Sequence, residues 1–236
     1  MNNKSNKIQK IIAQAGICSR RKAESLVLQG KVRINGKVAK IGDRAEITDI
    51  ITVGNKKISA QKTVYIALNK PEGYVCTNRN FKGEKNVLDL VGEQPRLFVA
   101  GRLDKDSCGL ILLTNDGDLC LKITHPRYEH KKIYEVEIKQ PDDVSDRFII
   151  KNFLNGINLE DGLKPARAEK IKTIGKNKFE IILMEGRNRQ IRRMFAQMRC
   201  AVQSLKRTKL GKIELRDLEK GEWRYITKED IGINSP

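Results

Sequence analysis

The stretch Gly101-Arg102-Leu103-Asp104-Lys105-Asp106-Ser107-Cys108-Gly109-Leu110-Ile111-Leu112-Leu113-Thr114-Asn115-Asp116-Gly117 decides the fold of this chain. Its second half, Gly109 to Thr114, is a short apolar run bounded by glycine and by an Asn-Asp-Gly turn, which predicts a buried strand. A helical pattern follows from Asp118 to Thr124. Asp104 is therefore expected in a loop at the entrance of a strand. A carboxylate there most often bonds its own backbone in a turn, so the rest of the sequence must decide whether it does chemistry.

The whole chain is strongly basic. It has 236 residues, with 47 Lys and Arg against 29 Asp and Glu, a net charge of +18 and a pI near 9.8. This excess predicts a polyanionic partner, most often nucleic acid, with an anionic membrane surface as the competing interpretation. No apolar run approaches the ~20 residues of a transmembrane helix, and residues 1–10 are polar, unlike a signal peptide. We therefore expect a cytoplasmic protein without a membrane partner.

The cysteines and histidines predict neither disulfides nor a metal site. The five cysteines are odd in number and scattered, and none forms a Cys-x-x-Cys pair. Cys120, His125 and His130 have a spacing that could suggest a metal, but a fourth ligand is missing nearby. The sequence also contains neither a P-loop nor a Gly-x-Gly-x-x-Gly fingerprint. We expect no metal and no cofactor.

The first 60 residues predict a small basic module. Apolar residues on one face predict a helix over Lys7 to Ala15 that ends at Gly16, and Ser19 can cap a second helix. The segment Val32-Arg33-Ile34-Asn35-Gly36 predicts a hairpin with a primed turn. These 60 residues hold 13 Lys and Arg against 4 Asp and Glu, a balance of +9 that is half of the net charge. The pattern is that of a helix-turn-helix-hairpin unit.

Three cations stand at the start of the second predicted helix: Arg20, Arg21 and Lys22. Backbone N–H groups and side chains can converge on a phosphate at such a position. The alternative is a helix start that is simply solvated.

The remainder of the chain predicts an α+β domain. A polar stretch over residues 56–62 suggests a linker, and from Val64 the chain becomes strand-rich without regular alternation of strands and helices. This favours a mixed, largely antiparallel sheet flanked by helices. The predicted strands are Val64–Leu68, Leu97–Ala100, Leu110–Thr114, Ile133–Ile138, Lys178–Met184 and Val202–Leu205.

Five ordered segments resemble a known family. Gly101 to Asp104, followed by Gly109 to Gly117, resembles the catalytic motif of the pseudouridine synthases of the ribosomal small-subunit-A and large-subunit-B type. Leu68–Tyr74 resembles the opening motif of this family, Lys132–Val136 its tyrosine motif, and Glu185–Met194 its arginine motif. The N-terminal module resembles the S4 RNA-binding domain. The resemblance therefore covers nearly the whole chain and implies an S4 domain over 1–60 and a catalytic domain over 64–236.

The resemblance also implies a site and roles for its residues. It implies a central sheet split into two lobes, with an RNA-binding cleft between them. Asp104 matches the catalytic aspartate, and Arg192 matches the arginine that pairs with it. Tyr134 matches a tyrosine that stacks on the target base and takes part in proton removal at C5. Arg102 matches an arginine that fills the space left when the target nucleotide is flipped out of the RNA.

The arginine motif predicts a helix with one charged and one buried face. Arg189, Arg192 and Arg193 fall at i, i+3 and i+4. We expect Arg192 alone beside the aspartate, and we expect Arg187, Arg189 and Arg193 to bind RNA phosphates. Asp106 is expected at the surface.

The leading hypothesis is an enzyme that isomerises a uridine in ribosomal RNA. The closest motifs are those of large-subunit enzymes of the F or B type, which favours 23S rRNA, with the small-subunit type as the alternative. The substrate is expected to be rRNA or a ribosomal assembly intermediate, and the protein a monomer. A non-catalytic S4-type ribosome-associated binding factor is the rival function. A DNA-binding regulator is a weaker third interpretation, because the sequence carries no dimer signal.

Overall fold

The computed structural model describes residues 5–46, 48–79, 81–128 and 130–232, which divide into two compact units. One unit is built from the N-terminal residues up to Val64 together with Asn115–Gly117, and the other from the rest of the chain. Within the described ranges, no helix is long and apolar enough to cross a membrane.

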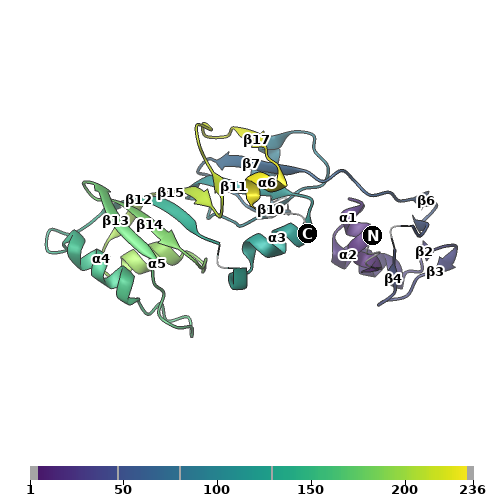
Figure 1. Cartoon of the computed structure of the whole chain (residues 1–236), viewed down its shortest axis with the longest axis horizontal. Helices are drawn as coiled ribbons and strands as arrows, with labels where there is room; N and C mark the ends of the chain where they lie inside the picture. Colours follow the sequence, from purple (N-terminus) through teal and green to yellow (C-terminus); the bar gives the residue numbers. More distant parts are fainter. Residues whose placement is uncertain (1–4, 47, 80, 129, 233–236) are drawn as a thin grey trace. The chain divides into compact units, whose positions relative to one another are not determined.

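The N-terminal unit has the predicted order of two helices and a hairpin (Figure 1). The turn between the hairpin strands has positive φ at both Asn35 (50°) and Gly36 (82°), as a primed two-residue turn requires. The core of this unit comes from the two helices, with Ile8, Ile12 and Ala23 completely buried, and from strand residues such as Val32 and Ile51. In chain order the elements are β1 (Asn6–Lys7), α1 (Ile8–Gln14), α2 (Arg20–Leu28), β2 (Val32–Ile34), β3 (Lys37–Val38), β4 (Arg44–Ala45), β5 (Ile51–Val53) and β6 (Lys56–Lys57).

The second unit is built on one extended mixed sheet (Figure 1). The strand order is β13-β14-β12-β15-β11-β7-β17, with β10 added to β11 and β16 added to β15. Every pairing in this sheet is antiparallel except that of β11 with β15. The prediction of a mixed, largely antiparallel sheet is confirmed. The elements are β7 (Tyr65–Lys70), β8 (Tyr74–Val75), β9 (Lys85–Asn86), η1 (Val87–Val91), β10 (Phe98–Ala100), β11 (Cys108–Thr114), α3 (Gly117–Thr124), η2 (Pro126–Tyr128), β12 (Lys132–Lys139), α4 (Asp146–Asn155), β13 (Lys170–Gly175), β14 (Lys178–Leu183), α5 (Gln190–Ala196), β15 (Ala201–Leu210), β16 (Ile213–Glu214), β17 (Trp223–Tyr225) and α6 (Lys228–Ile231).

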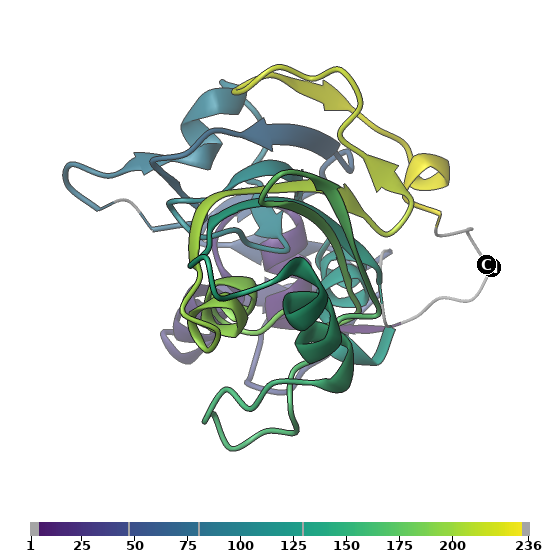
Figure 2. The ribbon, with the colours of Figure 1, turned by 90° about the vertical axis from the view of Figure 1, so that its left-hand side faces the viewer.

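Two separate hydrophobic cores divide this sheet into two lobes. In one lobe, α4 and α5 pack together on the curved strands β12 to β14, as Figure 2 shows. The rings of Phe153 and Phe195 lie 4.7 Å apart there, and that of Phe179 lies 6.0 Å from Phe195. In the other lobe, α3 and α6 contribute to a core built on β7 and β11. Each lobe is therefore stabilised by its own hydrophobic core, and the parallel pairing of β11 with β15 joins the two lobes.

Gly109 makes this junction possible. It pairs with Arg207 across the parallel strands and has a φ of 102°, which is unfavourable for any residue with a side chain. A Cβ atom at this position would lie 2.3 Å from the carbonyl oxygen of Arg207. The glycine that begins the predicted apolar run is thus required for the close approach of the two lobes.

Two predicted element boundaries were wrong, and one strand was missed. β15 continues to Leu210 instead of ending at Leu205. The prediction ended too early because the residues from Lys206 onward are largely charged, whereas this part of the strand forms by pairing with β12 and β11. The strand β13 was missed because it is mostly exposed and polar. Helix α5 begins only at Gln190, and Arg189 precedes it in the left-handed conformation with a φ of 48°.

Candidate active site

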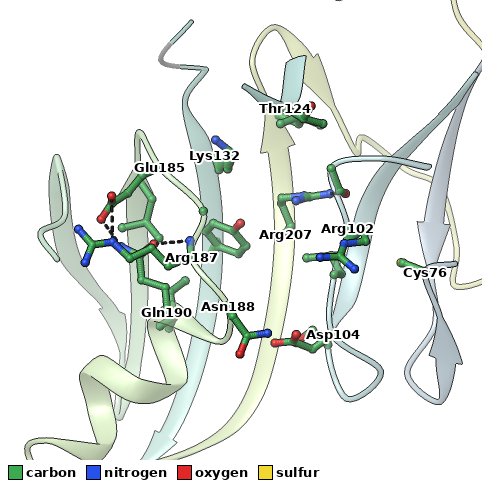
Figure 3. Close-up of a pocket in the computed structure, with 18 of the residues that line it drawn as sticks. Cys76, Arg102, Asp104, Thr124, Lys132, Glu185, Arg187, Asn188, Gln190 and Arg207 are labelled. Atoms are coloured by element: carbon green, nitrogen blue, oxygen red, sulfur yellow. Dashed lines mark hydrogen bonds and ion pairs between the residues drawn. The ribbon is translucent and has the colours of Figure 1, made fainter. Parts of the chain in front are cut away.

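A cavity of about 560 Å³ lies between the two lobes of the second unit. Asp104 and Arg102 line one side of it, and Asn188 and Gln190 line the other (Figure 3). Tyr134 also lines the cavity. The structure therefore brings together residues from motifs that are widely separated in the sequence.

The register of β12 and β15 forms one wall of the cavity. Tyr134 lies directly opposite Arg207, so the two side chains emerge on the same face of the sheet. Lys132, two residues before Tyr134, shares this face and also lines the cavity. Tyr134 is only 7% exposed, with its ring side supported by the core of its lobe. Its ring is therefore held in a fixed place rather than free at the surface.

A buried lysine, Lys70, anchors the loop that carries Asp104. Lys70 is completely buried, and its ammonium group donates hydrogen bonds to the carbonyl oxygens of Ser107 at 2.6 Å, Pro71 at 3.0 Å and Lys105 at 3.3 Å. Burial lowers the pKa of Lys70. The Gly73 N–H also donates to Lys105 O at 2.8 Å. The opening motif thus fixes the loop that carries Asp104 through backbone contacts.

The side chain of Asp104 is 29% exposed and lies near one arginine, Arg189. The nearest atoms of this ion pair, Arg189 Nη1 and Asp104 Oδ2, are 3.8 Å apart. The same guanidinium donates two shorter hydrogen bonds, at 3.2 and 3.1 Å, to the two carboxylate oxygens of Asp106. Asp104 is left with a nearby positive charge but without a tight partner that would occupy its oxygens.

The expected direct pair between Arg192 and Asp104 is wrong. Arg192 Nε lies 3.3 Å from the carboxylate of Asp106, and its terminal nitrogens donate to Asp106 O at 2.9 Å and Val202 O at 3.1 Å. Arg189 takes the place beside Asp104 because it stands just before α5, whereas Arg192 lies inside the helix against β15. Arg192 therefore links the helix to the loop that carries Asp104.

Asp106 lies at the surface as expected, with its side chain 48% exposed, and it is also the shared partner of both arginines. Burial alone would raise its pKa, but the hydrogen bonds from Arg189 and the charges of Arg192 and Arg189 outweigh burial and hold the pKa of Asp106 below its ordinary value. This carboxylate stays ionised at neutral pH and orients Arg189 next to Asp104.

We expect Asp106→Asn to lower the turnover rate about tenfold or more, because a hydrogen-bonded charge pair of this kind contributes on the order of 1.5 to 3 kcal/mol. RNA affinity should change little. A double-mutant cycle with Arg189→Gln measures whether the two residues act together, and Asp142→Asn, an exposed turn residue, is the charge control. Strictly additive losses would show that Asp106 does not act through Arg189.

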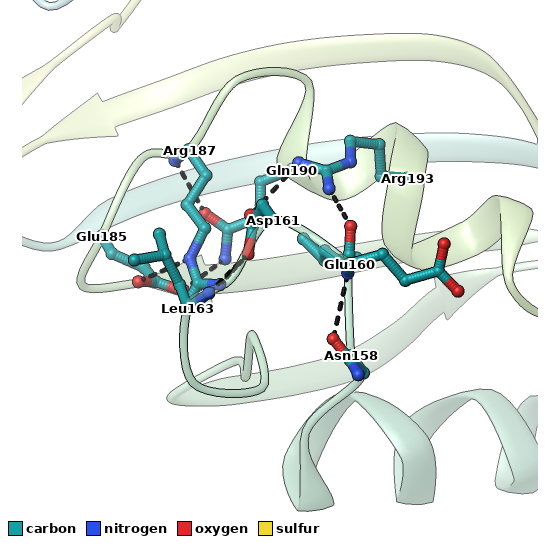
Figure 4. Close-up of polar contacts among 9 residues, drawn as sticks. Asn158, Glu160, Asp161, Leu163, Glu185, Arg187, Gln190 and Arg193 are labelled. Carbon is teal, nitrogen blue, oxygen red and sulfur yellow. Dashed lines mark hydrogen bonds and ion pairs between the residues drawn. The ribbon is translucent and has the colours of Figure 1, made fainter.

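Arg187 and Arg193 are held in ion pairs with one carboxylate, that of Asp161 (Figure 4). Both contacts measure 3.3 Å, and Arg187 also pairs with Glu185 at 3.1 Å. The Arg187 side chain is only 12% exposed. The two arginines fasten the loop that carries Asp161 to the arginine motif, so a phosphate contact by them stays a prediction.

The remaining predicted RNA contacts are in open positions. Arg102 is exposed at the cavity, and the side chain of Arg189 is 45% exposed. In the N-terminal unit, Arg20, Arg21 and Lys22 are exposed in the first turn of α2. Ser19 accepts a hydrogen bond from Lys22 N at 3.3 Å, which confirms it as the helix cap.

Two of the cations that line the cavity, Lys132 and Arg207, were given no role in the sequence analysis. Lys132 could have been found from its spacing of two residues from Tyr134, which puts both on one face of a strand. Arg207 could not, because its strand was not predicted to extend that far. Among the described residues, no group of three or more His, Cys, Asp or Glu side chains is arranged to hold a metal ion.

Comparison with known proteins gives consistent matches. A family profile described as RNA pseudouridylate synthase matches residues 64–197, and one described as S4 domain matches residues 7–51. Ribosomal large subunit pseudouridine synthase B of Bacillus subtilis (strain 168) is 38% identical over 231 residues, which cover 95% of this chain and 93% of that protein. Dual-specificity RNA pseudouridine synthase RluF of Escherichia coli (strain K12) is also 38% identical over 231 residues, with coverages of 95% and 77%. A crystal structure of a pseudouridylate synthase matches with a TM-score of 0.69 and 31% identity, covering 96% of this chain and 98% of that one.

Proposed function

The chain belongs to the RNA pseudouridylate synthase family, and we propose that it isomerises a uridine of ribosomal RNA to pseudouridine, with Asp104 as the catalytic residue. The observation that carries this proposal is the convergence of Asp104, Tyr134 and Arg189 on one cavity. A factor that only binds RNA needs basic residues but has no use for an acid, an aromatic ring and an arginine around a common space. The relatives named for ribosomal RNA favour the large-subunit RNA as the substrate.

The reaction needs no partner other than the RNA. An oxygen of the Asp104 carboxylate forms a bond to C1′ while the N1–C1′ bond breaks. The electron pair of the N1–C1′ bond leaves with the uracil. The detached uracil turns, and its C5 attacks C1′ and displaces the carboxylate. C5 then loses its proton and N1 gains one, so that the product is an isomer of the substrate.

Each remaining residue has a role that suits its position. The flat ring of Tyr134 suits it to stack on the uracil. Its polar hydroxyl suits it to take part in removing the C5 proton. Arg189, oriented by Asp106, keeps a positive charge beside Asp104. Arg102 is exposed at the edge of the cavity, where it can fill the gap left by the flipped nucleotide.

The two parts of the chain divide the work. We assign residues 1–60 to RNA binding and residues 64–236 to catalysis, in a monomeric protein that works in the cytoplasm without a cofactor. Residues 1–4 and 233–236, at the ends of these ranges, lie outside the described residues.

Tritium release tests the proposed function. The protein is incubated with ribosomal RNA, or with ribosomal assembly intermediates, in which uracil carries tritium at C5. Tritium should appear in water, and pseudouridine mapping of rRNA from cells with and without the protein should identify the position. If none of these RNAs releases tritium, the alternative of a non-catalytic ribosome-associated binding factor is favoured.

The salt dependence of RNA binding tests the role of the N-terminal unit. Replacing Arg20, Arg21 and Lys22 by glutamine should lower the slope of log affinity against log salt by about two, at roughly 0.7 to 0.9 per phosphate contact. The control removes three exposed lysines of the β13–β14 hairpin that do not line the cavity: Lys170, Lys176 and Lys178. If both triple variants change the slope equally, these three residues make no specific contribution.

A further inference from the structure

Two cations in the cavity wall have no carboxylate partner in the described part of the chain. Arg207 is only 1% exposed, and its guanidinium donates through Nε to Leu110 O at 2.8 Å and through Nη2 to Gly101 O at 2.7 Å. Its Nη1 has no hydrogen-bond partner among the described residues. The half-buried Lys132 donates to His130 O at 3.0 Å and Met184 O at 3.5 Å. Both side chains are therefore held in place by neutral carbonyl groups alone.

The two positive charges influence each other. Burial lowers the pKa of Lys132, and the charge of Arg207 lowers it further, while the charge of Glu185 raises it. Glu185 is itself committed to Arg187 at 3.1 Å and to Gln190 at 2.9 Å. The wall around Tyr134 therefore keeps a net positive potential.

An unpaired buried cation is costly to a folded protein, since its lost hydration is not replaced by a counter-ion. Arg207 cannot avoid this cost by losing its proton, because the pKa of a guanidinium is too high. Arg207 on β15 and the half-buried Lys132 on β12 share the face of this strand pair that also presents Tyr134, and they suit a ligand that brings or develops negative charge. The uracil of a uridine is neutral when it binds, but not after its bond to the sugar breaks.

We propose that Arg207 and Lys132 form an anion site for the detached uracil during the reaction. This inference rests on the proposed function and identifies which residues stabilise the leaving group. When the N1–C1′ bond breaks, both bonding electrons remain on N1, and the charge spreads over the ring to the exocyclic oxygens O2 and O4. N–H groups of Arg207 and Lys132 donate to this delocalised anion, while Asp104 bonds to C1′. The site is preorganised, so that its donors need no rearrangement when the charge forms.

The position of these cations also suits the turning of the base. Tyr134 stacks on the face of the uracil ring, whereas the two cations contact the edge of that ring. Because the negative charge is delocalised over the ring, the cations can stabilise it both before and after the uracil rotates. When C5 bonds to C1′, the ring gives up this electron pair and the anion disappears. The site thus acts only on the intermediate, which is where stabilisation accelerates a reaction.

A leaving-group experiment tests this proposal with full-length protein. Lys132→Met removes the charge and retains most of the side-chain volume, and Lys139→Met is the matched control, because Lys139 is exposed on the same strand and does not line the cavity. Arg207→Met is the second variant, with thermal melting to show whether it folds. Single-turnover rates are measured on one RNA carrying uridine and on the same RNA carrying 5-fluorouridine at the target. Fluorine withdraws electrons and stabilises the uracil anion without help from the protein.

Loss of 5-fluorouridine nucleoside after digestion reports cleavage of the N1–C1′ bond, since C5 carries fluorine in place of the proton. We expect Lys132→Met to slow uridine conversion about 100-fold, the size seen when one donor is removed from an oxyanion site. On 5-fluorouridine RNA the loss should be only roughly tenfold, and RNA affinity should be unchanged.

Equal losses on the two RNAs, or no loss on uridine, would overturn the anion site while leaving the proposed function intact, provided that the wild-type protein is active. If Arg207→Met does not fold, the Lys132 comparison decides the outcome by itself. An inactive wild-type protein would instead overturn the proposed function, and with it this inference.

Discussion

Asp104→Asn is expected to abolish turnover while the protein still folds and binds RNA. The change preserves the size of the side chain and much of its hydrogen-bonding capacity, but it removes the charge and the nucleophilic oxygen. Loss of a nucleophile from an enzyme site lowers the rate on the order of 10⁴-fold or more. Single-turnover tritium release from C5-labelled rRNA measures the effect.

The geometry around Asp104 explains why folding should survive this change. The carboxylate is 29% exposed, its ion pair with Arg189 is long at 3.8 Å, and Arg189 keeps its two hydrogen bonds to Asp106 in the variant. The loop itself is held by Lys70 through backbone oxygens rather than through Asp104. Asp217→Asn, at an exposed position, is the control. An Asp104→Asn enzyme with normal turnover would remove this aspartate from the mechanism.

Lys70→Met is expected to lower stability by roughly 3 kcal/mol or more, because a buried carbonyl that loses its donor costs about 1 to 3 kcal/mol. The variant removes the lysine donor from Ser107 O and Pro71 O, whereas Lys105 O keeps the Gly73 N–H. Methionine replaces the stem of the lysine but donates no hydrogen bond to Ser107 O, Pro71 O or Lys105 O. The melting temperature should fall by roughly 6 °C or more, at about 2 to 4 °C per kcal/mol for a domain of this size. Thermal unfolding with Lys139→Met as control measures this.

A second effect of Lys70→Met should appear in catalysis. Below its melting temperature, the folded variant should turn over more slowly than wild type, because the loop that presents Asp104 has lost its anchor. RNA affinity, which depends on exposed cations elsewhere, should remain. A variant as stable as wild type would show that the carbonyl groups of Ser107 and Pro71 find other donors.

The sequence by itself predicted much of the order of elements and indicated a candidate for the reacting group. Local signals were sufficient for the N-terminal hairpin, because Asn35-Gly36 accepts positive φ at both positions. They were also sufficient for the buried run that begins at Gly109, where hydrophobicity and turn residues agree. Asp104 and Tyr134 were named from motifs whose residues the structure then places around one cavity.

Only the tertiary structure decided which charges contact one another. Sequence spacing indicated that arginines would line one face of a helix, but the left-handed backbone at Arg189 and the register of β15 determine that Arg189 reaches Asp104 and that Arg192 reaches Asp106. The buried position of Arg207 could not be predicted for the same reason. It depends on the pairing of β15 with β11 and β12 rather than on the residues next to Arg207 in the sequence. Ion pairs form between side chains that distant strands bring within a few ångströms, and no local periodicity records that distance.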